Sequence, residues 1–85
     1  MNKLKGEVLK RLVVLEAANL PTIIKQSLAI KLDAIMMNIH NVDLVIDKLY
    51  WYLRALQELR DAGKIDNDLY AKLFIDPAIV LQNAQ

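Results

Sequence analysis

The single histidine of this chain is the first candidate for acid–base chemistry. His40 belongs to a row of charged residues spaced seven apart, and general acid–base catalysis needs a second titratable group within hydrogen-bond reach. Residues seven apart on a helix lie two turns apart, so they cannot touch within one chain. Asp43, three positions after His40, is near enough to pair with it. We therefore interpret His40 as a surface or capping residue.

Other residue types that carry catalysis are scarce. The chain has no cysteine, which excludes disulfides, zinc fingers and thiol catalysis. It has one serine, Ser27, outside any nucleophile motif, and its two glycines cannot form a phosphate-binding loop. The carboxylates and His40 do not have the spacing of metal ligands. We predict that the protein is not an enzyme and uses neither a cofactor nor a metal.

Basic residues near the start of the chain suggest one possible function. The first 31 residues carry six basic and two acidic side chains, whereas the remainder carries five and eight. Lysine and arginine contacts to phosphates supply most of the affinity for nucleic acid. The alternative function is therefore a small nucleic-acid-binding regulator that uses its basic N-terminal helix. Its candidate phosphate contacts are Lys3, Lys5, Lys10, Arg11 and Lys25.

Three consecutive aromatic residues, Tyr50, Trp51 and Tyr52, indicate a protein interface. Neighbouring residues on a helix point about 100° apart, so the three rings cannot all enter one core. Tyrosine and tryptophan are enriched at binding hot spots, and Trp51 ends a row of apolar residues seven apart. The predicted interface residues are Ile30, Met37, Leu44, Tyr50, Trp51 and Tyr52.

A longer apolar pattern determines which elements position these residues. Nine Leu, Ile or Val residues follow an unbroken 4-3 spacing, which is typical of helices that pack side by side along one line of apolar residues, here called the seam. The row that contains Ile30 and Trp51 lies nearly opposite this seam, so the helix is apolar on two sides. A domain of 85 residues can hardly cover both sides, and we therefore expect a homo-oligomer. The seam consists of Leu28, Leu32, Ile35, Ile39, Val42, Ile46, Leu49, Leu53 and Leu56.

Two arrangements of the long central segment remain open. A first helix is predicted over residues 3–18, and the next begins near Pro21, with no glycine or proline before Ala62. Either one helix of about 40 residues runs through, or it breaks near residues 38–41 with Asn41 as an N-cap. The continuous phase of the seam favours one helix. Two asparagines and a histidine in four positions favour the break, which is our preferred alternative.

Local signals define the C-terminal elements. Gly63 is expected to end the long helical segment, and Asp66 to cap a short helix. Asp76 followed by Pro77 predicts a last helix that reaches about Gln82. The predicted fold for residues 1–85 is a single all-α domain. It is a small helical bundle of two or three long helices plus two short C-terminal helices, in an oligomer.

Residues 56–74 resemble the short helical modules called SHOCT domains, which are helix–Gly–Ile–polar–helix hairpins. The resemblance is carried by Leu56, Leu59, Tyr70 and the run of six residues from Asp61 to Asp66. It covers less than a quarter of the chain. The glutamate run after the turn and the lysine pair of the second helix are missing, so it implies the hairpin and no function.

Composition limits the remaining functional classes. Apolar residues make up 55% of the chain, but no stretch approaches the ~18 needed to span a bilayer, and no signal peptide is recognisable. We expect a cytoplasmic, non-enzymatic protein-interaction module: a homo-oligomeric adaptor, regulator or inhibitor that occupies a surface of a larger protein partner. Small helical chains without motifs are frequent among phage and mobile-element accessory proteins, which suggests that setting.

Overall fold

The amphipathic segments of this sequence fold into five helices in the computed structural model, which describes residues 2–83. The helices are α1 (Asn2–Ala17), α2 (Thr22–Met37), α3 (Val42–Asp61), α4 (Asn67–Leu73) and α5 (Ala78–Asn83). No strand forms within these residues, so the predicted all-helical fold is confirmed. Three helices are long and two are short.

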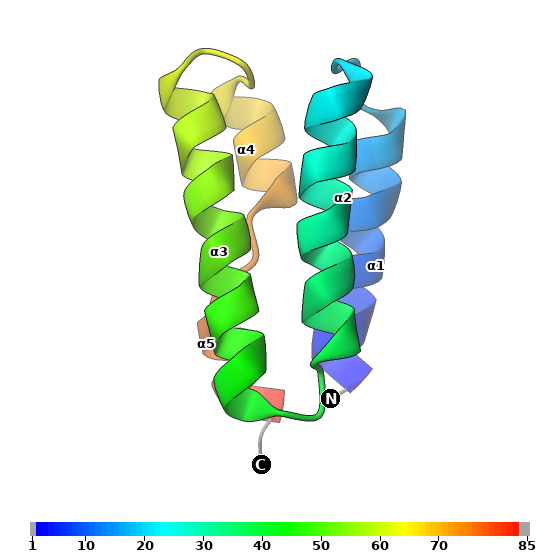
Figure 1. Cartoon of the computed structure of the whole chain (residues 1–85), viewed down its shortest axis with the longest axis vertical. Helices are drawn as coiled ribbons and strands as arrows, with labels where there is room; N and C mark the ends of the chain where they lie inside the picture. The colour runs from blue at the N-terminus through cyan, green and yellow to red at the C-terminus, as the bar shows by residue number, and fades with distance from the viewer. Residues whose placement is uncertain (1, 84–85) are drawn as a thin grey trace.

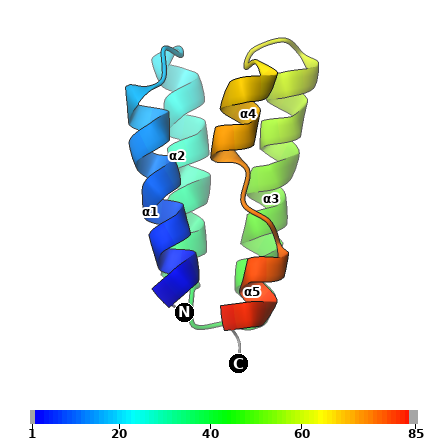
Figure 2. The same cartoon turned by 180° about the vertical axis from the view of Figure 1, so that it is seen from behind.

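Four parallel columns of helix surround one core. Helices α2 and α3 lie side by side and antiparallel, with α1 behind α2 and with α4 and α5 in line behind α3 (Figure 1). The view from behind shows α1 beside the column made by α4 and α5 (Figure 2). Because successive columns alternate in direction, α1 begins and α5 ends at the same end of the molecule.

The central segment breaks at residues 38–41, as the preferred alternative predicts. The side chain of Asn38 donates to the carbonyl of Ala34 at 2.7 Å, which occupies an acceptor in the last turn of α2. Asn41 then caps α3, where its side-chain oxygen accepts from the amide of Leu44 at 3.2 Å. Asparagine favours this position because its short side chain replaces a missing intrahelical partner.

The seam therefore folds back on itself. Leu28, Leu32 and Ile35 of α2 and Leu49 and Leu56 of α3 are completely buried. The seam positions Val42, Ile46 and Leu53 are only partly buried against this core, because the fully buried line of α3 is Val45, Leu49, Tyr52 and Leu56. Hydrophobic burial of this kind is the main stabilising contribution for a helical domain.

Side-chain and glycine caps define the C-terminal helices. Gly63 has a φ of 73°, its amide donates to the carbonyl of Arg60 at 3.0 Å, and the amide of Lys64 donates to that of Leu59 at 2.8 Å. This is a Schellman motif, which needs a residue free to adopt positive φ. Asp66 accepts from the amide of Leu69 at 2.8 Å and so caps α4 as predicted. The α3–α4 hairpin of the SHOCT resemblance is therefore present.

The final helix uses the same capping chemistry. The carboxylate of Asp76 accepts from the amide of Ala78 at 2.9 Å, one residue beyond Pro77. Ile75 and Val80, which flank this cap, are both buried in the core. The pair fixes the angle at which α5 returns to the bundle, as hydrophobic staples do.

Candidate protein interface

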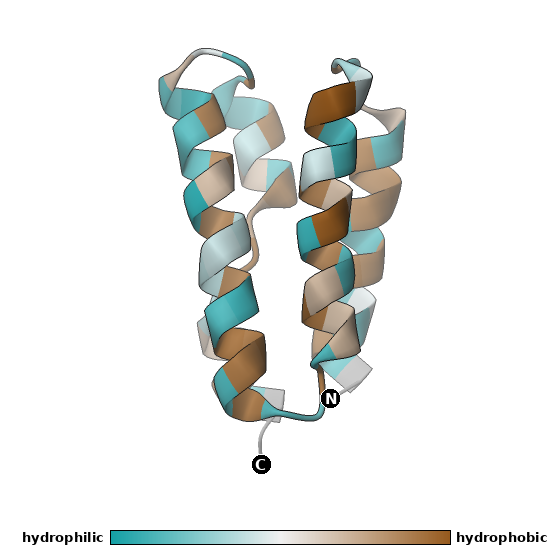
Figure 3. Cartoon of the chain, viewed as in Figure 1, coloured by the Kyte–Doolittle hydropathy of each residue, from teal (hydrophilic) through white to brown (hydrophobic). Residues whose placement is uncertain are grey.

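Helix α2 is apolar on its solvent side as well as on its core side. Ile23, Ile30 and Met37 are 76%, 61% and 85% exposed, and their seven-residue spacing places them along one side of the helix. Brown, hydrophobic segments recur along the side of α2 that faces the viewer in Figure 3. Isoleucine side chains exposed to water in such a row are typical of a surface that another molecule covers.

Helix α3 adds a second apolar row beside the first. Leu44 and Trp51 are 44% and 38% exposed and are also seven residues apart. Trp51 and Ile30 line one shallow depression between the two helices, which places the rows on the same side of the bundle. We call the surface formed by Ile23, Ile30, Met37, Leu44 and Trp51 the α2–α3 face.

The break between the helices creates this face. In one continuous helix the predicted interface residues Ile30, Met37, Leu44 and Trp51 would form a single line about 30 Å long. The turn at residues 38–41 folds that line into two short rows side by side. The structure thus brings four of the six predicted interface residues together. It adds Ile23, which the sequence analysis missed although it lies seven residues before Ile30.

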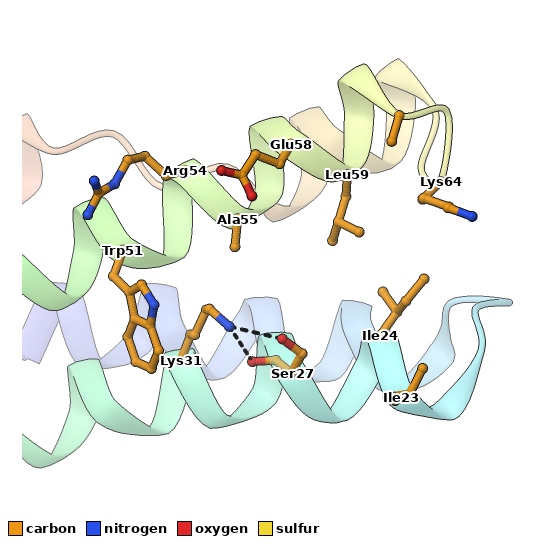
Figure 4. A pocket seen from close by; sticks show the side chains of 11 residues that line it. Ile23, Ile24, Ser27, Lys31, Trp51, Arg54, Ala55, Glu58, Leu59 and Lys64 are labelled. Atoms are coloured by element: carbon orange, nitrogen blue, oxygen red, sulfur yellow. Dashed lines mark hydrogen bonds between the residues drawn. The ribbon is translucent and has the colours of Figure 1, made fainter.

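A groove of about 800 Å³ adjoins the face, between the start of α2 and the end of α3. Ile24 and Leu59 point toward one another across it, and Trp51 lies at one end and Lys64 at the other (Figure 4). Arg54 and Glu58 also line it. The groove is therefore apolar in its middle and bordered by charges of both signs.

Lysine side chains hold the indole of Trp51 in place. The Nζ of Lys31 lies 4.7 Å from the centre of the Trp51 ring, and the Nζ of Lys48 lies 5.5 Å from it. Lys31 is itself oriented by donating to the Oγ of Ser27 at 2.9 Å (Figure 4). Cations over an aromatic ring contribute on the order of 0.5–1 kcal/mol at exposed sites, so these contacts favour the observed orientation of Trp51.

The three aromatic residues point in three directions, as predicted, but one prediction about them is wrong. Tyr52 is completely buried, and its hydroxyl donates to the carbonyl of Leu73 at 2.7 Å. Burial raises the pKa of the Tyr52 hydroxyl, against a smaller opposite effect of the Arg11 charge. Tyr52 is thus a core residue that ties α3 to the end of α4, and it is not available to a partner.

Tyr50 is separated from the α2–α3 face by its place on the helix. It is half exposed, and it points about 100° away from Trp51 around α3. A ligand that lies over Ile30 and Trp51 is therefore not expected to contact Tyr50. This difference makes Tyr50 a matched aromatic control for experiments on Trp51.

The candidate catalytic groups do not converge. Among residues 2–83, no ion pair joins His40 to Asp43, and no three His, Asp or Glu side chains gather where they could hold a metal ion. Ser27 and Lys31 are in hydrogen-bond contact, but the amides around them are part of α2. These backbone amides donate their hydrogen bonds within the helix, so they cannot stabilise an oxyanion.

Arg11 has a structural role rather than the predicted role of a phosphate contact. Its guanidinium pairs with the carboxylate of Glu7, and its Nε and Nη2 donate to the carbonyl of Phe74 at 3.2 and 2.7 Å. Partial burial alone would raise the pKa of Glu7, but the charges of Arg11 and Lys10 hold it below its usual value. Arg11 therefore anchors α1 to the segment after α4 and is only partly exposed.

The predicted lysine contacts do not form one surface either. Lys3 donates to the side chain of Gln82 at 3.0 Å, and Lys25 donates to the carbonyl of Glu16 at 2.8 Å. Lys10 lies 3.6 Å from the carboxylate of Glu7. Lys5 lies two residues after Lys3, which places it on the opposite side of α1 from Lys3 and Lys10. The lysines of α1 are therefore divided between two sides of that helix, and Lys25 lies on α2.

Comparison with known proteins supplies no family assignment. The sequence matches no protein-family model, and neither a curated protein nor a solved structure is significantly similar to it. The resemblance of residues 56–74 to SHOCT domains is therefore confined to the local hairpin. In the part of the chain that the structure describes, no helix combines the length and apolarity needed to cross a membrane.

Proposed function

We propose that the protein is a non-enzymatic interaction module. It self-associates and acts as an adaptor, regulator or inhibitor by occupying a surface of a larger protein. The observation that carries this proposal is the α2–α3 face, on which five large apolar side chains are exposed. Exposing an apolar surface of this kind to water costs free energy, and association removes that cost.

The composition of the face suits binding to protein. Trp51 is the type of residue that most often dominates binding energy, and the lysines at its ring orient it before a partner arrives. Met37 is the most exposed member of the face, and a methionine side chain adapts to an irregular partner surface. The adjoining groove offers Ile24 and Leu59 to a side chain of the partner.

Nucleic-acid binding is the weaker of the two functions considered. Arg11 is engaged with Glu7 and Phe74, and the lysines of α1 lie on opposite sides of that helix. Neither arrangement offers the row of cations that follows a phosphate backbone. A mobility shift of generic duplex DNA that weakens steeply with salt would support this alternative instead.

The test of the proposed function is the substitution Trp51→Ala. We expect helix content close to that of the unchanged protein, because Trp51 is outside the core. Loss of a hot-spot aromatic reduces binding by about 2 kcal/mol or more, which is roughly thirtyfold in affinity. The measurement is affinity capture from lysate followed by identification of the retained proteins.

Tyr50→Ala is the matched control, because it removes an exposed aromatic residue from the same helix but from another side. A genuine partner is retained by the unchanged chain and by Tyr50→Ala and is lost with Trp51→Ala. If all three chains retain the same proteins and have the same mass in solution, the α2–α3 face is not the binding surface.

A further inference from the structure

We infer that a second copy of this chain covers the α2–α3 face, packed antiparallel about a two-fold axis that passes near Ile30 and Trp51. This inference rests on the proposed function and specifies one of its partners, which competes with the larger protein for the same face. In such a dimer, α2 lies on α2 of the second copy, and α3 lies on α3. The contact is isologous, so each copy contributes the same residues and the assembly closes at two chains.

The spacing of the apolar row on α2 is self-complementary in this orientation. Ile23 and Met37 lie at equal distances before and after Ile30. When the helices pack antiparallel with Ile30 on the axis, Ile23 of each copy meets Met37 of the other. All three positions are exposed in one chain, so the contact buries them without moving the core.

The polar residues that flank this row pair in the same register. Gln26 lies four residues before Ile30 and Asp33 three residues after it, on one flank of α2. Antiparallel packing sets the Asp33 carboxylate of one copy opposite the Gln26 amide of the other, which can donate to it. Both side chains are exposed, and the two-fold symmetry generates two copies of this pair in the dimer.

Helix α3 gives an independent indication of the same register. Asp47 lies four residues before Trp51 and Arg54 three residues after it, both exposed on one flank. Trp51 lies beside the segment of α2 that contains Ile30, since both line the same depression and the Nζ of Lys31 lies over the Trp51 ring. With Trp51 near the axis, Asp47 of each copy faces Arg54 of the other. Complementary charges of this kind select a register and suppress wrong ones.

The area of the face is adequate for a dimer. At the exposures given above, its five side chains present on the order of 600 Å² of surface, and a standard interface buries ~800 Å² per partner. Gln26, Asp33, Asp47 and Arg54 supply the surrounding polar rim. A chain of 85 residues also has little burial of its own, so a second copy adds stability where it is needed.

Cysteine cross-linking tests this arrangement directly, because the chain has no cysteine of its own. Packed helices have axes 8–10 Å apart and Cα atoms about 2.3 Å from the axis, which brings facing Cα atoms into disulfide range at the two-fold. We therefore expect Ile30→Cys to form a disulfide dimer under mild oxidation. Gln57→Cys, an exposed site about 120° around α3 from Trp51, is the control.

The orientation is tested with two further variants. Ile23→Cys and Met37→Cys should each fail to cross-link alone, because the two copies of either residue lie about 20 Å apart in the antiparallel dimer. An equimolar mixture of the two should form the mixed disulfide. Cross-linking of Ile30→Cys and of the mixture should be about a thousandfold faster than that of Gln57→Cys at micromolar concentration, since packed thiols have a millimolar effective concentration.

Three results would overturn the inference. Rapid cross-linking of Ile23→Cys or Met37→Cys alone would show a parallel arrangement. Equal rates for Ile30→Cys and Gln57→Cys would show random collision. Circular dichroism confirms that each variant is folded. Light scattering measures the mass of the unchanged chain in solution. A monomer that still captures a partner through Trp51 refutes the dimer and the proposed self-association but keeps the proposed binding to a larger protein, whereas a monomer that captures nothing refutes both.

Discussion

The substitution Leu32→Asp is expected to unfold the protein. Leu32 is completely buried at the centre of α2, and within residues 3–82 no polar or charged residue is buried in the core. A carboxylate placed there has no partner, and the cost of several kcal/mol is comparable with the whole stability of a small domain. We expect loss of the helical circular dichroism signal at room temperature.

Leu9→Asp provides the matched control for this change. Leu9 is exposed on α1, so the same substitution places the carboxylate in water. We expect the control to cost less than about 1 kcal/mol, mainly through the lower helix propensity of aspartate. A folded Leu32→Asp protein with an unchanged melting midpoint would show that the seam is not the core.

Tyr52→Ala is expected to have the second-largest effect. It removes a fully buried ring and leaves a cavity where α3 meets the end of α4, a change that typically costs about 3–5 kcal/mol. Tyr52→Phe keeps the ring but leaves the carbonyl of Leu73 without its donor, at a cost of about 1–3 kcal/mol. Urea unfolding curves of the two variants separate packing from hydrogen bonding.

The raised pKa of Tyr52 adds a dependence on pH. In the unfolded chain a tyrosine hydroxyl titrates near pH 10, whereas burial keeps it protonated to higher pH in the folded chain. The contribution of Tyr52 to stability is therefore complete below about pH 10 and is lost as the pH rises through the folded pKa. Tyr52→Phe should lose less stability above pH 10 than the unchanged protein. An equal loss in both proteins would place the hydroxyl in water.

The helix boundaries were the most predictable part of the fold. Asn41, Gly63, Asp66 and Asp76 act at the positions that their cap chemistry predicted, because a cap depends on a few neighbouring backbone groups. The choice between one central helix and two could not be decided by the seam. Its 4-3 spacing fits one long helix and also two helices that pack around one core.

The surface was predictable in part. Exposure of Ile30, Met37, Leu44 and Trp51 followed from a row opposite the seam. Tyr52 was assigned to the wrong side because the buried side of α3 is set by its packing on the end of α4. That contact joins residues 21 positions apart, but the buried residues of α3, Val45, Leu49, Tyr52 and Leu56, also follow a 4-3-4 spacing that could have placed Tyr52 in the core.

Arg11 shows the same limitation among the charged residues. Its sequence neighbours made it look like one member of a basic helix face. Its guanidinium instead reaches the carbonyl of Phe74, 63 residues away, and pairs with Glu7 one turn before it. Only the return of the C-terminal segment along α1 provides that acceptor, so no spacing rule within α1 could have identified it.

The mass of the unchanged protein in solution tests the central claim most directly. The claim is that the exposed α2–α3 face is covered by protein, in the first instance by a second copy. Light scattering over a series of micromolar concentrations should give at least twice the 9.7 kDa of one chain. A mass of 9.7 kDa at every concentration would contradict self-association, and the apolar rows of Ile30 and Trp51 would then be exposed in the free protein.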